Sequence, residues 1–544
     1  MHVTVFLRRR AALPPTGELD AAFDELAADL GELERLASDA AERLRSTGRD
    51  LLRHRRDLDG DSLDLIEEQL RRLSASYEAI RRTAGDLRRD AHLGPRSPEL
   101  LAGLTAERGR HADRLRTLQG MAAAVIVASE WQSPSFAHSI LGNAGRRAGT
   151  VRPHEDDYRR DRHPDAAAFE DVYLAAYVDP PDRLELRALA TSCGMSAFTT
   201  ILGFLLLEGK LEPPILMGAS VYHECRDLVR ATVPGDGVVE VSEHPPDLLP
   251  DAIRRLRPRV VFLDSIGNAP GTLVPDVPSV IGSLDANVPG AYLVLDNTGL
   301  SCTFRPFELI RGRRGIRLLA FESLTKYAQF GMDRVAGGIV LAGRRDGEDL
   351  DRYREHLGAN IPDASVLSIP RPDRAALERR LARLERNAIL LASRVRQAAV
   401  ATGDVAVTGA DHPALPDHPS HRLAQRLGFR GGWFSLRFAA EADRPVVHER
   451  FLHLAMDEAR RRRVPLIAGA SFGLDTTRVY ATASTARYGR PFVRVSPGIE
   501  HARAIERTGD VLAAAVVRLA EEVGGLRPPG LEGAGTRSAS RRAG

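Results

Sequence analysis

The first part of the chain carries a helical pattern of apolar residues. Within residues 18–118 these side chains recur three or four positions apart, at Leu19, Phe23, Leu26, Leu30 and Leu33, and again at Leu63, Ile66, Leu70 and Leu73. The stretch 57–61, rich in Asp with one Gly, interrupts the pattern as a turn would. The spacing predicts two or three long antiparallel, coiled-coil-like helices in residues 1–118. No catalytic motif lies there, so we expect a packing or oligomerisation module, with a partner-binding arm as the alternative.

The pattern changes after residue 118, where short apolar runs alternate with helical segments. The runs that read as buried strands are 214–217, 259–264, 291–296, 316–321 and 337–341. Such alternation predicts a parallel, doubly wound α/β sheet, and we place a large domain at 171–369 after an extended arm at 119–170. A long helix at 374–398 and strands at 434–439 and 492–496 predict a smaller α+β domain over 370–526. The Gly-, Pro-, Ser- and Arg-rich end, 527–544, predicts a disordered tail.

Charge and cysteine usage exclude several classes of protein. Basic and acidic residues number 76 and 73, a net charge of +3, which argues against a nucleic-acid-binding protein. The longest apolar stretches, 121–128 and 198–207, are too short to cross a bilayer, and the N-terminal run lacks the form of a signal peptide. The cysteines Cys193, Cys225 and Cys302 are odd in number and dispersed, which indicates reduced thiols. We therefore expect a cytoplasmic protein with neither a membrane nor a nucleic-acid partner.

Lysine is nearly absent, which draws attention to the two places that keep it. Lys210 and Lys326 are the only lysines; every other basic side chain besides histidine is arginine. Lys210 follows a helical run beside a Gly, where a cation at a helix C-terminus is ordinary. Lys326 instead follows an apolar strand, at the sheet edge where ligands bind in open α/β sheets. Ser323 and Thr325 flank it as candidate phosphate ligands, and a desolvated lysine, unlike arginine, can act as an amine nucleophile.

Three further segments suit the chemistry of pyridoxal 5′-phosphate (PLP). Asp296 ends an apolar strand, where a buried acid needs a cationic partner such as a pyridinium nitrogen; an Asp that caps the following turn is the alternative. The small residues of 192–196 precede a helix and would offer backbone N–H groups to a phosphate. Tyr222 follows another strand and could stack on an aromatic ring, although a core tyrosine has the same pattern.

Taken in order, these segments resemble the Cys/Met-metabolism family of fold-type-I PLP enzymes, which includes cystathionine γ-synthase, cystathionine lyase and methionine γ-lyase. Matching motifs run from about residue 158 to residue 500, among them Tyr158-Arg-Arg160, Ser323-Leu-Thr-Lys326 and the run from Val493 to Glu500. The resemblance implies an α/β fold with an aspartate-aminotransferase-like large domain, a mostly parallel sheet and a smaller α+β C-terminal domain. The N-terminal helical module is additional to that pattern.

The resemblance also implies residue roles. Lys326, Tyr222 and Asp296 would be catalytic, with Lys326 bound covalently to PLP. The residues that would hold the cofactor are Tyr158, Arg160, Gly194, Met195, Tyr222, Asn268, Asp296, Thr298, Ser323, Thr325 and Lys326. Ser471 and Arg494 would hold the α-carboxylate of a small amino-acid substrate. Because Tyr158 and Arg160 would reach the cofactor phosphate of a neighbouring subunit, a homodimer at least, and plausibly a homotetramer, is implied.

Several positions depart from the family pattern and predict a remodelled substrate pocket. Asp264 stands where the family has Glu, Gly299 where an aromatic residue is usual, and Leu474 where a second Gly is usual. The expected activity is β/γ-elimination or γ-replacement on an amino acid in a specialised pathway. An aminotransferase is the alternative enzyme, and a non-catalytic PLP-fold scaffold or regulator that uses the helical module is the alternative of another class. The His- and Asp-containing stretch 411–421 is an ordinary loop composition, and we expect no metal.

Overall fold

The computed structural model describes residues 19–53, 60–128, 164–181, 184–313 and 315–525. Most of the expected arm at 119–170 and the whole of the expected tail at 527–544 lie outside this set. Tyr158 and Arg160 lie outside it as well. In the described part of the chain, the structure contains no helix with the length and apolarity that a bilayer crossing requires.

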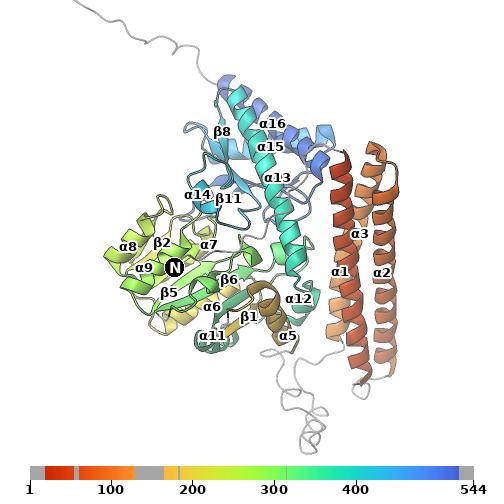
Figure 1. The fold of residues 1–544 in the computed structure, drawn as a ribbon, viewed down its shortest axis with the longest axis horizontal. Helices are drawn as coiled ribbons and strands as arrows, with labels where there is room; N and C mark the ends of the chain where they lie inside the picture. The colour runs from red at the N-terminus through yellow and green to blue at the C-terminus, as the bar shows by residue number, and fades with distance from the viewer. Residues whose placement is uncertain (1–18, 54–59, 129–163, 182–183, 314, 526–544) are drawn as a thin grey trace, which may run out of the picture.

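Three long helices form the N-terminal module and stand side by side at one edge of the molecule (Figure 1). They are α1 (Leu19–Arg53), α2 (Gly60–Leu93) and α3 (Pro98–Ala128). The apolar positions that predicted them, such as Leu33 and Leu73, are buried between them. The third helix continues past residue 118, because Ala122, Ala123 and Ile126 extend its buried face. The predicted boundary at 118 therefore falls inside α3.

The large domain is built on a seven-stranded sheet of order β1-β7-β6-β5-β4-β2-β3. The strands are β1 (Leu186–Thr191), β2 (Ile215–Gly218), β3 (Val238–Val241), β4 (Val260–Asp264), β5 (Ala291–Asp296), β6 (Ile316–Ser323) and β7 (Gly338–Gly343). From β3 to β6 all neighbours are parallel, as predicted. The prediction of a mostly parallel sheet is thus confirmed, and the exception is β7, which is antiparallel to both β6 and β1. The short segment from Ser323 to Gly338 holds only the 3-10 turn Tyr327–Gln329 and no crossover helix, so the chain reverses direction.

Helices accompany the sheet, and those from α6 to α10 carry the connections between its strands. The helices are α5 (Pro164–Tyr173), α6 (Gly194–Leu207), α7 (His223–Thr232), α8 (Leu248–Leu256), α9 (Val277–Asn287), α10 (Pro306–Leu309), α11 (Arg344–His356) and α12 (Asp363–Ser368), with short turns at Leu174–Val178 and Ser301–Thr303. The central strands are buried almost completely, β2 and β4 at every position, whereas the edge strand β3 is only partly buried. This explains why the central strands read as continuous apolar runs in the sequence.

The C-terminal part forms a second α+β unit. Its five strands pair in the order β10-β11-β12-β9-β8. Its elements are α13 (Arg374–Ala401), β8 (Val407–Asp411), α14 (His421–Ala424), β9 (Phe434–Phe438), α15 (Pro445–Arg462), β10 (Ile467–Ala468), β11 (Arg478–Thr482), β12 (Phe492–Ser496) and α16 (Ala502–Gly525). The long helix α13 runs between this unit and the N-terminal module (Figure 1).

The N-terminal module shares its core with the large domain. Leu33 and Leu36 of α1 belong to the same buried apolar cluster as Phe330 and Ile369. Polar contacts add to this packing, since the Arg43 guanidinium donates to the carbonyl oxygen of Leu367 at 2.6 Å. The module is therefore an integral part of the molecule, and its position relative to the cavity described below is fixed by packing.

Candidate active site

One cavity of about 400 Å³ lies at the carboxyl ends of the parallel strands and is bordered on one side by loops of the C-terminal unit. All the predicted site residues that the structure describes line it: Gly194, Met195, Tyr222, Asn268, Asp296, Thr298, Ser323, Thr325, Lys326, Ser471 and Arg494. They come from segments far apart in the chain. Tyr158 and Arg160, which the resemblance assigns to a neighbouring subunit's site, lie outside the described residues.

Lys326 follows β6 by three residues, so its side chain enters the cavity from the sheet edge. Its Nζ donates a hydrogen bond to the Ser471 Oγ at 3.0 Å. Burial, helped by the positive charge of Arg494, lowers the pKa of this amine to about 8. A substantial fraction of the amine is therefore neutral near physiological pH, which is the form that a nucleophile or a proton acceptor requires.

Two carboxyl groups lie side by side at the ends of neighbouring strands. Asp264 of β4 pairs in register with Asp296 of β5. Burial raises the pKa of Asp296 to about 6, although hydrogen bonds from Thr298 oppose the shift. Burial and the charges of Asp296 and Glu243 raise the pKa of Asp264 well above its ordinary range. Of the two groups, Asp264 is thus the one whose proton is favoured by the charge of its neighbour, which leaves Asp296 as the carboxylate of the pair.

The surroundings of the Asp296 carboxylate show whether PLP fits this cavity, because the pyridine nitrogen of PLP needs an acidic partner. Within the described ranges Asp296 forms no ion pair, and its carboxylate accepts hydrogen bonds only from Thr298, whose backbone N–H donates at 2.8 Å. A carboxylate in the cavity wall that is largely withdrawn from water and has no ion-pair partner is costly. A protonated pyridine nitrogen supplies the missing cation, so the donor set fits the cofactor.

Another part of the cavity wall suits a phosphate group. Helix α6 begins at Gly194, and its N-cap residue Cys193 accepts from the Ser196 N–H through its sulfur. Ser323 and Thr325 place their hydroxyl oxygens 2.8 Å apart beside this helix start. A Cβ atom on Gly194 would lie only 2.7 Å from the Ser323 Cβ. The glycine therefore allows the helix N-terminus and the two hydroxyls to face a single anion.

Arg494 of β12 supplies a buried cation on the substrate side. Its Nη1 donates to the Asn268 Oδ1 at 2.8 Å, whereas its Nε is buried without a partner among the described residues. Burial lowers the pKa of the guanidinium to about 10, so it stays charged at neutral pH. An amino-acid carboxylate is the kind of ligand that a fixed guanidinium of this geometry binds.

Aromatic and acidic residues that the sequence did not single out as site residues also line the cavity. Trp433 stacks against Phe472, with the ring centroids 4.5 Å apart. A Cβ on Gly299 would lie 2.8 Å from the Trp433 Cη2, so the missing side chain at Gly299 makes room for this indole. Glu224 lies next to Tyr222 and faces the cavity as well. Trp433 could have been noticed as one of only two tryptophans in the chain, but nothing in the sequence pairs it with Gly299.

The residues that the sequence assigns to ordinary structural roles lie away from this site. Lys210 follows α6, with its Nζ 5.9 Å from the Phe204 ring centroid. In the stretch 411–421, the ring of His412 bonds to the Gly431 carbonyl oxygen and that of His418 to the Gly271 carbonyl oxygen. Within the part of the chain that the structure covers, no three His, Cys, Asp or Glu residues are grouped as a metal site would need.

The large domain carries a lysine and an aspartate at adjoining ends of its parallel strands, and a helix N-terminus suited to phosphate. A second α+β unit follows it. Together these features define a PLP-binding protein of fold type I. The sequence profile of the Cys/Met metabolism PLP-dependent enzymes matches residues 106–507. The chain belongs to this family, as its motifs indicated, and PLP is accordingly its cofactor.

Individual relatives are distant. A bifunctional enzyme, flvA, of Aspergillus flavus is 24% identical over 322 residues, which cover 58% of this chain and 37% of the fungal protein. An O-succinylhomoserine sulfhydrylase of Mycobacterium tuberculosis is 27% identical over 54% of this chain and 66% of its own length. The chain thus matches less than two thirds of either relative. Cystathionine gamma synthase of Xanthomonas oryzae pv. oryzae shares the fold, with a TM-score of 0.52 and 23% identity over 69% of this chain and 90% of that structure.

Proposed function

We propose that the protein is a PLP-dependent lyase or transferase that eliminates or replaces a group at the β- or γ-carbon of an amino acid. The observation that carries the proposal is the placement of the Lys326 amine, the Asp296 carboxylate and the Arg494 guanidinium in one cavity. The similarity to an O-succinylhomoserine sulfhydrylase supports replacement chemistry at the γ-carbon.

Different residues of the cavity would bind different parts of the substrate and the cofactor. Arg494 binds the α-carboxylate and thereby orients the Cα–H bond toward Lys326. Asp296 holds a proton on the ring nitrogen, and Gly194, Ser323 and Thr325 anchor the phosphate. When bound, PLP withdraws electrons from the substrate Cα and so stabilises the negative charge that develops there.

Proton movement falls to Lys326 once its amine is free. The low pKa of Lys326 leaves the Nζ able to accept the proton from Cα and return it to a neighbouring carbon. Tyr222, which lines the same cavity, would stack on the cofactor ring and assist departure of the leaving group. Its hydroxyl stays protonated, because burial raises its pKa further above the ordinary value.

The assembly and the compartment belong to the same proposal. Tyr158 and Arg160 would donate to the cofactor phosphate of a neighbouring subunit, so the active unit would be at least a homodimer, with a homotetramer as the larger assembly. The three cysteines are free, which suits a reducing compartment such as the cytoplasm. The remodelled pocket around Gly299 and Trp433 suits a specialised amino-acid substrate.

Product analysis tests the proposal. Purified holoenzyme would be incubated with amino acids that carry a leaving group at the β- or γ-carbon, with and without a thiol. Release of the leaving group together with a keto acid and ammonia, or capture of the carbon skeleton by the thiol, is the expected result, and the Lys326→Ala variant should give neither. Transfer of the amino group to an added keto acid without loss of the leaving group would instead identify an aminotransferase.

A further inference from the structure

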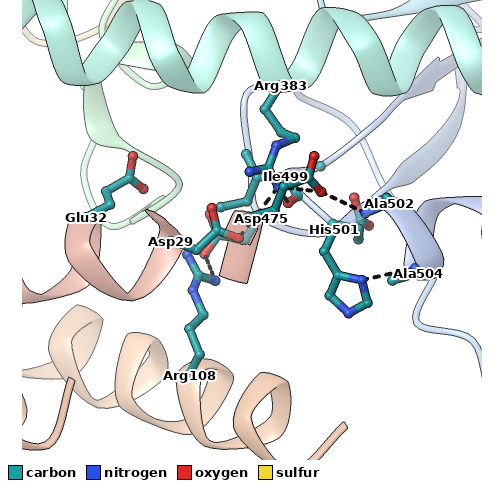
Figure 2. A network of polar contacts seen from close by, with 12 residues as sticks. Asp29, Glu32, Arg108, Arg383, Asp475, Ile499, His501, Ala502 and Ala504 are labelled. Carbon is teal, nitrogen blue, oxygen red and sulfur yellow. Dashed lines mark hydrogen bonds and ion pairs between the residues drawn. The ribbon is translucent and has the colours of Figure 1, made fainter. Parts of the chain in front are cut away.

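Helix α3 of the N-terminal module contacts two loops that border the cavity. The Arg116 guanidinium donates to the Gly331 carbonyl oxygen at 2.8 Å and to the Asp475 Oδ2 at 3.1 Å. The Arg108 guanidinium donates to the same Oδ2 at 2.8 Å (Figure 2). Gly331 follows Lys326 by five residues, and Asp475 follows Ser471 by four. Helix α3 thus binds both the loop that follows Lys326 and the loop that follows Ser471, and these two residues contact each other in the site.

Asp475 is the common anion of this contact. Arg380 of α13 donates to the other carboxylate oxygen at 2.5 Å and to the Gly473 carbonyl oxygen at 3.3 Å. Arg380 is itself paired with Glu32 of α1 at 2.7 Å. Burial alone would raise the pKa of Asp475, but the charges of Arg108, Arg380 and Arg116 outweigh burial and hold it well below its ordinary range. The carboxylate is therefore charged at neutral pH and accepts hydrogen bonds from all three arginines.

The loop that Asp475 anchors has an unfavourable backbone. Ser471 adopts a φ of 78° and Gly473 a φ of 82°, both in the left-handed region. For a serine this conformation is costly and persists only where the surroundings enforce it. Gly473 also has no room for a side chain, because a Cβ there would lie 2.7 Å from the Tyr327 ring. The Ser471 hydroxyl, held in this way, accepts the hydrogen bond from Lys326 at 3.0 Å.

We propose that the N-terminal helical module is a positioning element of the active site, in which Arg108 and Arg116 act through Asp475 to hold Ser471 against Lys326. Arg116 also fixes the loop that follows Lys326 through the Gly331 carbonyl. The module would thereby set the affinity for the amino-acid carboxylate, which the Ser471 loop and Arg494 bind together. This inference rests on the proposed amino-acid site and not on the particular bond that is broken.

A second ion pair ties the module to the rest of the enzyme without touching these loops. Glu25 of α1 pairs with Arg386 of α13 and accepts from the backbone N–H of Ala502 at 2.8 Å. The side chains of Arg386 and Arg116 are 11% and 20% exposed, so both are largely buried. Arg386→Ala is therefore a control for loosening of the module, because the hydrogen bonds of the Arg386 guanidinium go to Glu25 and Asn387 and not to Asp475 or Gly331.

The experiment compares the full-length holoenzyme with Arg116→Ala, Arg108→Ala, Arg116→Lys and Arg386→Ala variants. The probe is L-alanine, which binds as an amino acid but carries no leaving group, and its dissociation constant is read from the change in cofactor absorbance. Arg116→Ala and Arg108→Ala should weaken L-alanine binding about tenfold or more, since small displacements of positioning groups are costly. Arg116→Lys should recover part of the loss, and Arg386→Ala should leave the constant within about threefold of wild type while lowering the melting temperature.

A second readout uses the apoprotein and no turnover. Loosening the Ser471 loop admits water to Lys326, so the pH midpoint of its chemical labelling should rise from near 8 toward the ordinary lysine value in Arg116→Ala but not in Arg386→Ala. Unchanged L-alanine binding and an unchanged midpoint in both Arg116→Ala and Arg108→Ala would overturn the proposal. An equal loss of L-alanine affinity in Arg386→Ala would also overturn the proposal, because the effect would then come from general loosening of the N-terminal module. Failure of the lyase assay alone would leave these binding results standing and would count only against the proposed reaction.

Discussion

At the scale of single residues, burial controls the chemistry of this site. It lowers the pKa of Lys326 and raises that of Asp296 within one cavity, so a partly neutral amine and a carboxylate coexist there. Arginine at position 326 could not serve, because a guanidinium keeps its proton at any working pH. Because lysine is scarce in the chain, its retention at position 326 is informative.

The pKa of Lys326 gives a pH-dependent prediction for the apoprotein. In a Lys210→Arg background, labelling of Lys326 by an acylating reagent should be half-maximal near pH 8 instead of near the ordinary value of about 10.4. Since the folded chain loses this proton at lower pH than the unfolded chain, the free energy of unfolding should rise with pH between the two values. Peptide mass spectrometry across a pH series measures the first effect. A midpoint at the ordinary value would show that the amine is solvated.

How far the sequence predicts the site depends on how near each partner lies in the chain. Lys326, Asp296 and the residues around Gly194 were predicted because each stands in a local context of strand end or helix start. Trp433 beside Gly299 and Asp475 beside Arg108 were not predicted. The second pair is 367 residues apart, and no local pattern encodes a contact of that kind.

At the scale of elements, the site depends on how closely helix α6 approaches the end of β6. Gly194 begins the helix, and its missing side chain lets the backbone pack on Ser323. The apolar runs of the large domain predicted β2, β4, β5, β6 and β7, but they did not predict β1 or β3. The reversed direction of β7 was not predicted either, since an apolar run has the same composition in either direction. Only the lack of a crossover helix between residues 323 and 338 carries that information.

The Gly194→Ala variant tests this approach. The added methyl group would clash with Ser323, and overpacking of this kind costs about 1–3 kcal/mol, so we expect PLP affinity to fall about tenfold or more. The dissociation constant of PLP, measured by titrating the apoprotein, checks the expectation. Gly203→Ala in the same helix is the control, because its methyl group would meet only the end of the movable Leu357 side chain. Equal PLP affinity in Gly194→Ala and wild type would contradict this account of the phosphate site.

At the scale of the whole molecule, the proposed sharing of sites between subunits predicts complementation. The Lys326→Ala and Arg160→Ala variants should each lose most activity, and each lacks a different half of the proposed site. After the two are mixed, dissociated and reassociated, random pairing in a symmetric dimer should restore about a quarter of the wild-type sites. Activity of the mixture and its mass by light scattering measure the outcome. No recovery in a mixture shown to contain hybrids would place Arg160 in its own subunit's site.

The arrangement of α3 has a practical consequence for anyone who shortens this protein. The family profile begins at residue 106, two residues before Arg108 and inside a helix that packs on α1 and α2. A truncation at that point would keep both arginines but strip away the helices that orient them, along with Glu32, the acidic partner of Arg380. Expression of a catalytically competent fragment therefore calls for a start before Leu19, even though the match to the family begins far downstream.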